Sequence, residues 1–147
     1  GKSILIHSGS GGVGQAAIEV AIAKNLEVFT TVSSDEKKNF LLQKFPKLKA
    51  ENIGNSRNIS FEKMILTNTK GKGVDYVLNS LADDKLHASI RCLGKGGTFL
   101  EIGKYDIMKG TQLDMRYLSK RISFKAVLFD DLPTDSEEME VSFIFSH

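Results

Sequence analysis

The sequence predicts an α/β fold in which short parallel strands form one sheet and helices cover both of its faces. Three observations support this prediction. Runs rich in β-branched and aromatic residues alternate with amphipathic stretches, glycine clusters separate several of them, and the first apolar run leads directly into a glycine-rich turn. This alternation is typical of βαβ units. Their right-handed crossovers produce a doubly wound sheet with the strand order 3-2-1-4-5-6.

The individual elements follow from the periodicity of apolar residues. Strands are expected at residues 4–7, 27–32, 52–53, 74–78, 98–102 and 123–129. Helices are expected at residues 14–25, 34–44, 61–67 and 83–93, and residues 104–121 are expected to form a loop with a short helix. Ser33 and Glu36 have the spacing of a capping box at the start of the second helix. Glycine clusters at 71–73 and 94–97 are expected to end the last two helices.

Composition places the chain among ordinary globular domains. It has 147 residues, of which 41% are hydrophobic and 26% are charged, with a net charge of +2 and no basic stripe. This balance excludes disordered and fibrous classes and gives little support to nucleic-acid binding. A single cysteine excludes a disulfide framework and favours a reducing, cytoplasmic compartment. No apolar run approaches the roughly 20 residues that span a bilayer, so no membrane association is expected.

The glycine-rich turn is the most informative motif. Gly9, Gly11 and Gly14 fit the G-x-G-x-x-G spacing, and they lie between a predicted strand and a predicted helix. In this context Gly9 permits a tight turn, Gly11 allows the backbone to approach a pyrophosphate, and Gly14 permits close packing of helix on sheet. We therefore expect the Rossmann type of this fold, with a dinucleotide at the helix start. The residues expected to bind it are Ser8, Gly9, Ser10, Gly11, Gly12, Val13 and Gly14.

The end of the second strand favours NADPH over NADH. An NAD site usually has an acidic residue about 20 residues after the turn, where it binds the ribose 2′-hydroxyl. Here Ser33 and Ser34 stand at that position, and Lys37 follows within reach of the same corner. Hydroxyl groups and a lysine suit a 2′-phosphate. The alternative is that Lys37 and Lys38 form a solvated face of the helix.

Other polar residues follow the remaining strands, where ligands bind in an open parallel sheet. Arg57 is a candidate to stack on adenine or to bind a phosphate, and Asn79 is a candidate to bind the nicotinamide side. Further cofactor candidates at these ends are Ser80 and Gly103. His7 is expected to be a core residue rather than a base. The three histidines and one cysteine show no metal-ligand spacing, so no metal site is expected.

Several stretches together resemble the enoyl reductase module of animal-type fatty acid synthases. The resemblance lies in residues 6–17, 28–32, 71–75, 77–81, 91–93 and 99–104, in that order and spacing. They include Asn79-Ser80-Leu81 and Glu101-Ile102-Gly103-Lys104. The resemblance extends over residues 1–131 and implies the zinc-free branch of the medium-chain dehydrogenase/reductase superfamily. Polyketide synthase reductases share much of it.

The resemblance implies a reaction in fatty acid biosynthesis. NADPH delivers hydride to the β-carbon of a trans-2-enoyl thioester carried on acyl carrier protein, and the α-carbon is then protonated. Lys37 matches the family's cofactor-binding lysine, and Lys104 and Asp130 match its candidate proton donors. The implied partners are the other modules of a multidomain, homodimeric synthase.

The chain departs from this family at both ends. The family's substrate-binding half precedes Gly1, and the start at Gly1-Lys2-Ser3 suggests a piece of a larger protein. Residues 132–147 form a divergent or truncated tail after the domain at 1–131. Three alternatives remain: a polyketide synthase enoyl reductase, a quinone oxidoreductase that shares the turn, and a non-catalytic dinucleotide-binding fragment.

Overall fold

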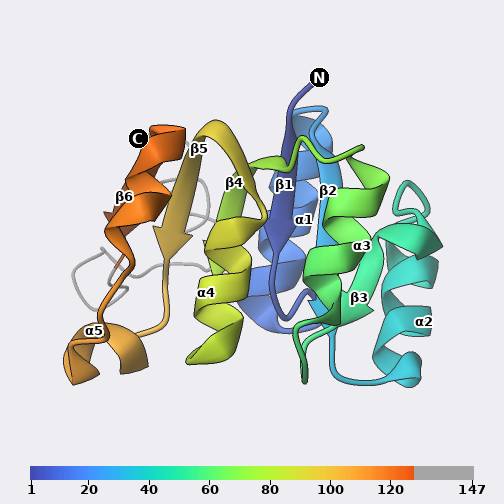
Figure 1. Ribbon diagram of the computed structural model, residues 1–147. Coiled ribbons are helices and arrows are strands. Elements are labelled where there is room, and N and C mark those ends of the chain that lie inside the picture. The colour runs from blue at the N-terminus through green and yellow to red at the C-terminus, as the bar shows by residue number, and fades with distance from the viewer. Residues whose placement is uncertain (128–147) are drawn as a thin grey trace.

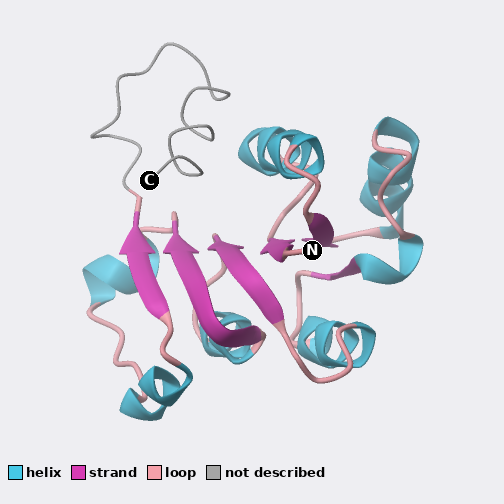
Figure 2. Ribbon diagram, turned by 90° about the horizontal axis from the view of Figure 1, so that it is seen from above, coloured by secondary structure: helices cyan, strands magenta, loops and turns pink. Residues whose placement is uncertain are grey.

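The computed structural model describes residues 1–127, which form one parallel sheet with helices on both faces (Figures 1 and 2). Its strands are β1 (Ser3–Ile6), β2 (Glu27–Val32), β3 (Ile53–Asn55), β4 (Val74–Asn79), β5 (Leu93–Glu101) and β6 (Ser123–Ala126). They lie in the order β3-β2-β1-β4-β5-β6, and every neighbouring pair is parallel. The predicted doubly wound fold and its strand order are confirmed.

Four helices cover the sheet, two on each face (Figure 2). Helices α1 (Gly12–Ala23) and α2 (Asp35–Lys44) pack on one face, and α3 (Ser60–Asn68) and α4 (Asp84–Arg91) pack on the other. The predicted loop at 104–121 contains α5 (Tyr105–Lys109) and a 3₁₀ helix, η2 (Met115–Lys120). A further 3₁₀ turn, η1 (Ala50–Asn52), precedes β3 and was not predicted.

The strands are buried on both faces, as expected for a parallel sheet. Ile4 and Ile6 pack toward α1 and α2, whereas Leu5 between them packs toward α3 and α4, and all three are fully buried. Full burial of such a side chain contributes about 1.5–3 kcal/mol. Two apolar cores, one on each side of the sheet, therefore hold β1 rigidly at the centre of the molecule.

The boundary between α4 and β5 differs from the prediction. Helix α4 ends at Arg91, and β5 begins at Leu93 and continues through the glycine cluster that was expected to be a loop. Val74 pairs with Leu93 and Tyr76 with Thr98, so the register shifts between these pairs. A Cβ on Gly94 would lie 2.5 Å from the carbonyl oxygen of Lys72. The glycines thus allow the irregular strand to approach its neighbour more closely than other residues would.

The carboxyl ends of the strands meet at one edge, which lies at the bottom of Figure 1, while β1 begins at the top. Strand β6 ends at Ala126, and residues 128 and 129 of its predicted range lie outside the described residues. Asp130 and the tail at 132–147 also lie outside them. Within residues 1–127, no helix is long and apolar enough to cross a membrane.

Candidate functional site

The turn between β1 and α1 lies at the carboxyl edge of the sheet, next to the end of β2. The N–H of Gly9 donates to the carbonyl of Thr31 at 3.0 Å, and the N–H of Gly11 donates to the carbonyl of Ser8 at 3.1 Å. The left-handed residue of the turn is Ser8, with φ 53°, rather than a glycine. Gly9 follows directly and does not itself have a positive φ, so its role in the turn depends on the space around it.

Gly9 and Gly14 are needed because their surroundings leave no space for a side chain. A Cβ on Gly9 would overlap the hydroxyl of Thr30, and a Cβ on Gly14 would overlap the carbonyl of Ser8 and lie 2.7 Å from the Cα of Gly9. A Cβ on Gly11 would meet only the carbonyl of Ser8, at an ordinary 3.5 Å. Gly9 and Gly14 thus serve packing, whereas Gly11 leaves open space beside the start of α1.

The start of α1 offers donors for an anion. The helix begins at Gly12, two residues earlier than predicted, so Gly12 and Val13 belong to its first turn. The cap residue Gly11 provides no side-chain hydrogen bond to the first N–H groups. Those groups have no partner within the helix, and the helix dipole adds positive potential there. Exposed backbone at Gly11 and Gly12 leaves these donors accessible, which fits the pyrophosphate of a dinucleotide.

The end of β2 carries hydroxyl groups and a lysine. Ser34, not Ser33, caps α2, because its hydroxyl accepts from the N–H of Lys37 at 3.3 Å. The predicted capping box of Ser33 and Glu36 is therefore wrong, because the cap is Ser34 and the third residue of the helix is Lys37. Ser33 instead accepts a hydrogen bond from the Nζ of Lys37 at 2.9 Å. The geometry brings these three residues together at the corner where a 2′-phosphate is predicted.

Arg57 lies beside the same corner. Val32 pairs with Asn55, and the N–H of Ser56 donates to the carbonyl of Val32 at 2.9 Å. The side chain of Asn55 then accepts from the N–H of Arg57 at 2.8 Å, which fixes the exposed turn that follows β3. Strands β2 and β3 therefore place the turn that contains Arg57 beside the end of β2, and its contact with an adenine or a phosphate stays a prediction.

On the other side of the turn, Asn79 lies at the end of β4. Its buried amide nitrogen donates to Glu101 Oε2 at 2.6 Å and to the carbonyl of Leu81 at 2.8 Å. The other carboxylate oxygen of Glu101 accepts from the N–H of Gly103 at 2.8 Å. Asn79 and Glu101 thus clamp the ends of β4 and β5 together, while Ser80 is exposed beside them. A direct contact between Asn79 and a nicotinamide stays a prediction. The amide nitrogen of Asn79 already donates to Leu81 and Glu101.

Glu101 is the functional candidate that the sequence analysis missed. Burial raises the pKa of its carboxyl to about 7, and nearby Asp106 acts in the same direction, while hydrogen bonds from Asn79 and Gly103 lower it. The sequence signal that could have identified it is an acidic residue at the end of an apolar strand. Perturbed acids of this kind are concentrated at functional sites.

Lys104 follows Gly103 at the carboxyl end of β5, where it is exposed and occupies the cap position of α5. The structure therefore places it at the predicted edge, on the same side as Asn79 and Glu101. Asp130 lies outside the described residues, so its role stays a prediction.

His7 is a core residue, as predicted. It is 3% exposed, and burial lowers its pKa to about 3. Among residues 1–127, no group of three or more His, Cys, Asp or Glu side chains is arranged to hold a metal ion.

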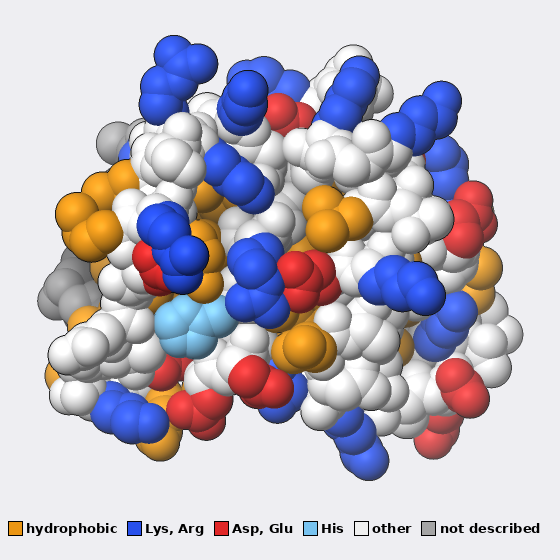
Figure 3. Space-filling model, viewed as in Figure 1, with side chains coloured by type: hydrophobic (Ala, Val, Ile, Leu, Met, Phe, Trp, Pro, Cys, Tyr) orange, Lys and Arg blue, Asp and Glu red, His pale blue; other side chains and the backbone are white. Residues whose placement is uncertain are grey.

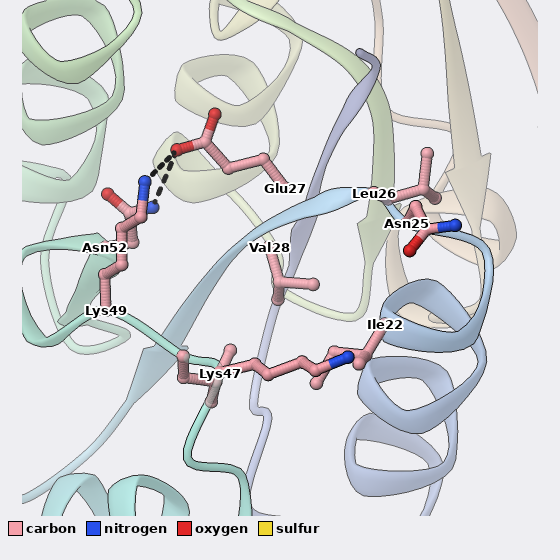
Figure 4. A pocket seen from close by; sticks show the side chains of 9 residues that line it. Ile22, Asn25, Leu26, Glu27, Val28, Lys47, Lys49 and Asn52 are labelled. Atoms are coloured by element: carbon pink, nitrogen blue, oxygen red, sulfur yellow. Dashed lines mark hydrogen bonds and ion pairs between the residues drawn. The ribbon is translucent and has the colours of Figure 1, made fainter.

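The opposite edge of the sheet has its own hollows. One of them, with a volume of about 390 Å³, lies between the end of α1, the start of β2 and residues 47–52 (Figure 4). Three of its polar side chains are paired with one another, since Glu27 accepts from Lys49 at 3.2 Å and from Asn52 at 3.3 Å. Lysine and arginine side chains gather along this edge, at the top of Figure 3. Neither feature lies near the glycine-rich turn.

Comparison with known proteins agrees with this geometry. Residues 12–145 match the zinc-binding dehydrogenase family. The nucleotide-binding subdomain of the enoylreductase domain of PpsC from Mycobacterium tuberculosis is 35% identical, with a TM-score of 0.83, over 100% of this chain and 82% of that chain. The chain belongs to the enoyl reductase family. This family belongs to the medium-chain dehydrogenase/reductase superfamily, which the sequence resemblance had indicated.

Other enoyl reductase relatives define how much of a larger protein is represented. The CurK enoyl reductase is 33% identical with a TM-score of 0.75, and the match covers 99% of this chain but 42% of that chain. The highly reducing polyketide synthase anuA of Penicillium roqueforti is 49% identical over 95% of this chain and 6% of its own length. The lovastatin diketide synthase lovF of Aspergillus terreus is 48% identical over 86% of this chain and 5% of its own length.

These relatives favour one of the alternatives that the sequence left open. The anuA protein is a polyketide synthase, and the enoyl reductase domain of another polyketide synthase is 35% identical with a TM-score of 0.80 over 100% of this chain and 80% of that chain. The similarity therefore supports a polyketide synthase enoyl reductase better than the fatty acid synthase module named first. The assignment to the enoyl reductase family is unaffected.

Proposed function

We propose that this chain is the NADPH-binding part of an enoyl reductase in a polyketide synthase. The observation that carries the proposal is the glycine-rich turn, in which two glycines pack without space for a Cβ and a third leaves the start of α1 open. The similarity to the enoylreductase subdomain of PpsC supports it. The proposed substrate is a trans-2-enoyl thioester on acyl carrier protein, and the proposed partners are the other modules of a homodimeric synthase.

Each part of the cofactor has a proposed partner on the carboxyl edge. The first turn of α1 holds the pyrophosphate through backbone N–H groups. Ser33, Ser34 and Lys37 hold the 2′-phosphate through charge-assisted hydrogen bonds, and Arg57 lies against the adenine. When bound, NADPH supplies a hydride for the β-carbon of the substrate.

Lys104 is the proposed acid of the reaction. Addition of hydride leaves negative charge on the thioester oxygen and the α-carbon. A cation at that position stabilises this charge, and an acid there protonates the α-carbon. A normal aspartate, with a pKa near ~3.9, is ionised at neutral pH and donates poorly. Asp130 therefore acts in this proposal by orienting Lys104 or a water.

The test uses the complete reductase that contains this chain, with Lys104→Ala, Asp130→Ala and the double variant. The proposal expects Lys104→Ala to lower kcat by about 100-fold or more while NADPH affinity stays unchanged, because general acid catalysis contributes on that order. A raised KM for NADPH with kcat intact would instead make Lys104 a cofactor contact. If Lys104→Ala changed neither kcat nor the KM for NADPH, both roles would be contradicted.

A further inference from the structure

A buried chain of hydrogen bonds connects the glycine-rich turn to helix α4. His7 Nδ1 lies 2.9 Å from the hydroxyl of Thr31, and His7 Nε2 lies 2.7 Å from the hydroxyl of Ser89. Thr31 and Ser89 are fully buried, and the His7 ring packs edge-on against Phe61 with 4.8 Å between centroids. The proposed hydride-transfer chemistry does not use this histidine.

The direction of each hydrogen bond follows from the donors that are available. The hydroxyl of Ser89 donates its only hydrogen to the carbonyl of Lys85 at 2.6 Å, because a carbonyl cannot donate. Ser89 must therefore accept from His7, which places the proton on Nε2. The pKa of His7, lowered by burial to about 3, makes the ring neutral, so Nδ1 is an acceptor and Thr31 donates to it.

The chain ends on the backbone of the turn. The hydroxyl oxygen of Thr31 accepts from the N–H of Ser8 at 3.3 Å, and the carbonyl of Thr31 accepts from the N–H of Gly9 at 3.0 Å. Ser8 has a left-handed φ of 53°, a conformation that a non-glycine residue keeps only where its surroundings hold it. Thr31 is the side chain that holds the N–H of Ser8, while the N–H of Gly11 donates to the carbonyl of Ser8, and His7 fixes the rotamer of Thr31.

We infer that His7, as its neutral Nε2-protonated tautomer, is a positioning residue for the Ser8–Gly9 turn and thereby for the dinucleotide. Its Nδ1 orients Thr31, which secures the turn, and its Nε2–H attaches this unit to α4. The inference rests on the proposed function for its effect on NADPH, but the tautomer and the geometry of the turn can be measured without any cofactor.

The first measurement is made on this chain without cofactor. Long-range ¹H–¹⁵N NMR spectra should show the Nε2-protonated pattern for His7 at neutral pH, and removal of the ring should shift the amide resonances of Ser8 and Gly9. An Nδ1-protonated or charged ring would overturn the inference. Unchanged Ser8 and Gly9 resonances in the variants would also overturn it.

The second measurement compares His7→Asn with His7→Gln. The Asn amide can replace Nδ1 and keep an acceptor for Thr31, whereas the Gln amide can replace Nε2 and keep only the contact with Ser89. Positioning predicts that His7→Gln binds NADPH about 10-fold more weakly, the effect of one lost hydrogen bond, while His7→Asn stays near wild type. A purely structural role predicts the reverse order, because Gln fills more of the cavity.

The variant Ile65→Ala serves as a stability control. Ile65 is fully buried on the same face, so the substitution should lower the melting temperature without changing NADPH affinity. Equal NADPH affinity for both His7 variants and wild type would overturn the positioning role and leave the proposed function intact. If wild type bound no NADPH, the proposed function would fail. The resonances of Ser8 and Gly9 alone would then decide whether His7 positions the turn.

Discussion

At the scale of single residues, the carboxyl edge combines an exposed pair of polar residues with a buried pair. Ser33 and Lys37 form an exposed polar corner at the end of β2. Asn79 and Glu101 form a buried clamp between the ends of β4 and β5. The first arrangement suits a charged group that arrives from solvent. The second fixes the strand ends from which Ser80 and Lys104 project.

Glu101 makes a testable contribution to pH-dependent stability. Its pKa is raised to about 7 in the folded protein, so stability from its neutral form is fully present below about pH 4.5 and is lost as pH rises through 7. We expect the unfolding free energy of wild type, relative to Glu101→Gln, to fall by on the order of 1 kcal/mol between pH 5 and 8 after allowance for partial exposure. Chemical denaturation at several pH values measures this difference. A difference that does not vary with pH would contradict the assignment.

Single-residue detail is also where sequence-based prediction was weakest. Ser34 rather than Ser33 caps α2, a shift of one residue that the spacing of serines and acidic residues did not reveal. The left-handed conformation of Ser8 was not predicted, because the hydrogen bond that holds it comes from Thr31, a tertiary neighbour. The carboxylate of Glu101 was overlooked because its partners, Asn79 and Gly103, lie 22 residues before and two residues after it.

At the scale of elements, the β1–turn–α1 unit determines whether a dinucleotide can bind. Gly14 has no space for a side chain, whereas Gly11 is open and is expected to face the ligand. Alanine substitutions at these two positions therefore form a matched pair. A Cβ on Gly14 meets backbone atoms of Ser8 and Gly9, whereas a Cβ on Gly11 meets nothing closer than 3.5 Å.

We expect Gly14→Ala to reduce the unfolding free energy by about 1–3 kcal/mol, the usual cost of overpacking. Gly11→Ala should change it by less than about 0.5 kcal/mol, since Gly11 has an extended φ of −75° that alanine adopts freely. Gly11→Ala should nevertheless weaken NADPH binding by about 10-fold, because its methyl group obstructs the approach of the pyrophosphate. Urea denaturation and fluorescence titration measure the two effects. Unchanged affinity in Gly11→Ala would show that the pyrophosphate does not lie against this turn.

Element order was predictable because apolar periodicity and glycine positions decide it. The alternation of strands and helices led to the correct sheet order. The start of β5 was not predicted, because Gly94 and Gly97 resemble a loop in sequence. Only pairing with β4 shows that they belong to an irregular strand. Gly94 in this strand and Gly73 immediately before β4 allow the two segments to approach closely.

At the scale of the whole molecule, this chain corresponds to 42% of the CurK enoyl reductase. Hydride transfer requires the acceptor carbon about 3–3.5 Å from the donor in a site that excludes water. We expect the chain alone to bind cofactor but not to oxidise NADPH in the presence of crotonyl-CoA, because a second wall is needed to orient the acyl chain. Absorbance of NADPH follows the reaction, with the complete reductase as positive control. Steady oxidation by the chain alone would contradict this expectation.

We expect the carboxyl edge to bind NADPH through the turn and the corner formed by Ser33 and Lys37. Fluorescence titration of wild type, Lys37→Glu and the neighbouring control Lys38→Glu with NADPH and NADH tests this binding. Wild type should prefer NADPH by about 10- to 100-fold, the effect of one charge-assisted hydrogen bond. Lys37→Glu should lose that preference, and Lys38→Glu should largely retain it. Equal binding of NADPH and NADH by wild type, or equal effects of the two lysine substitutions, would contradict it.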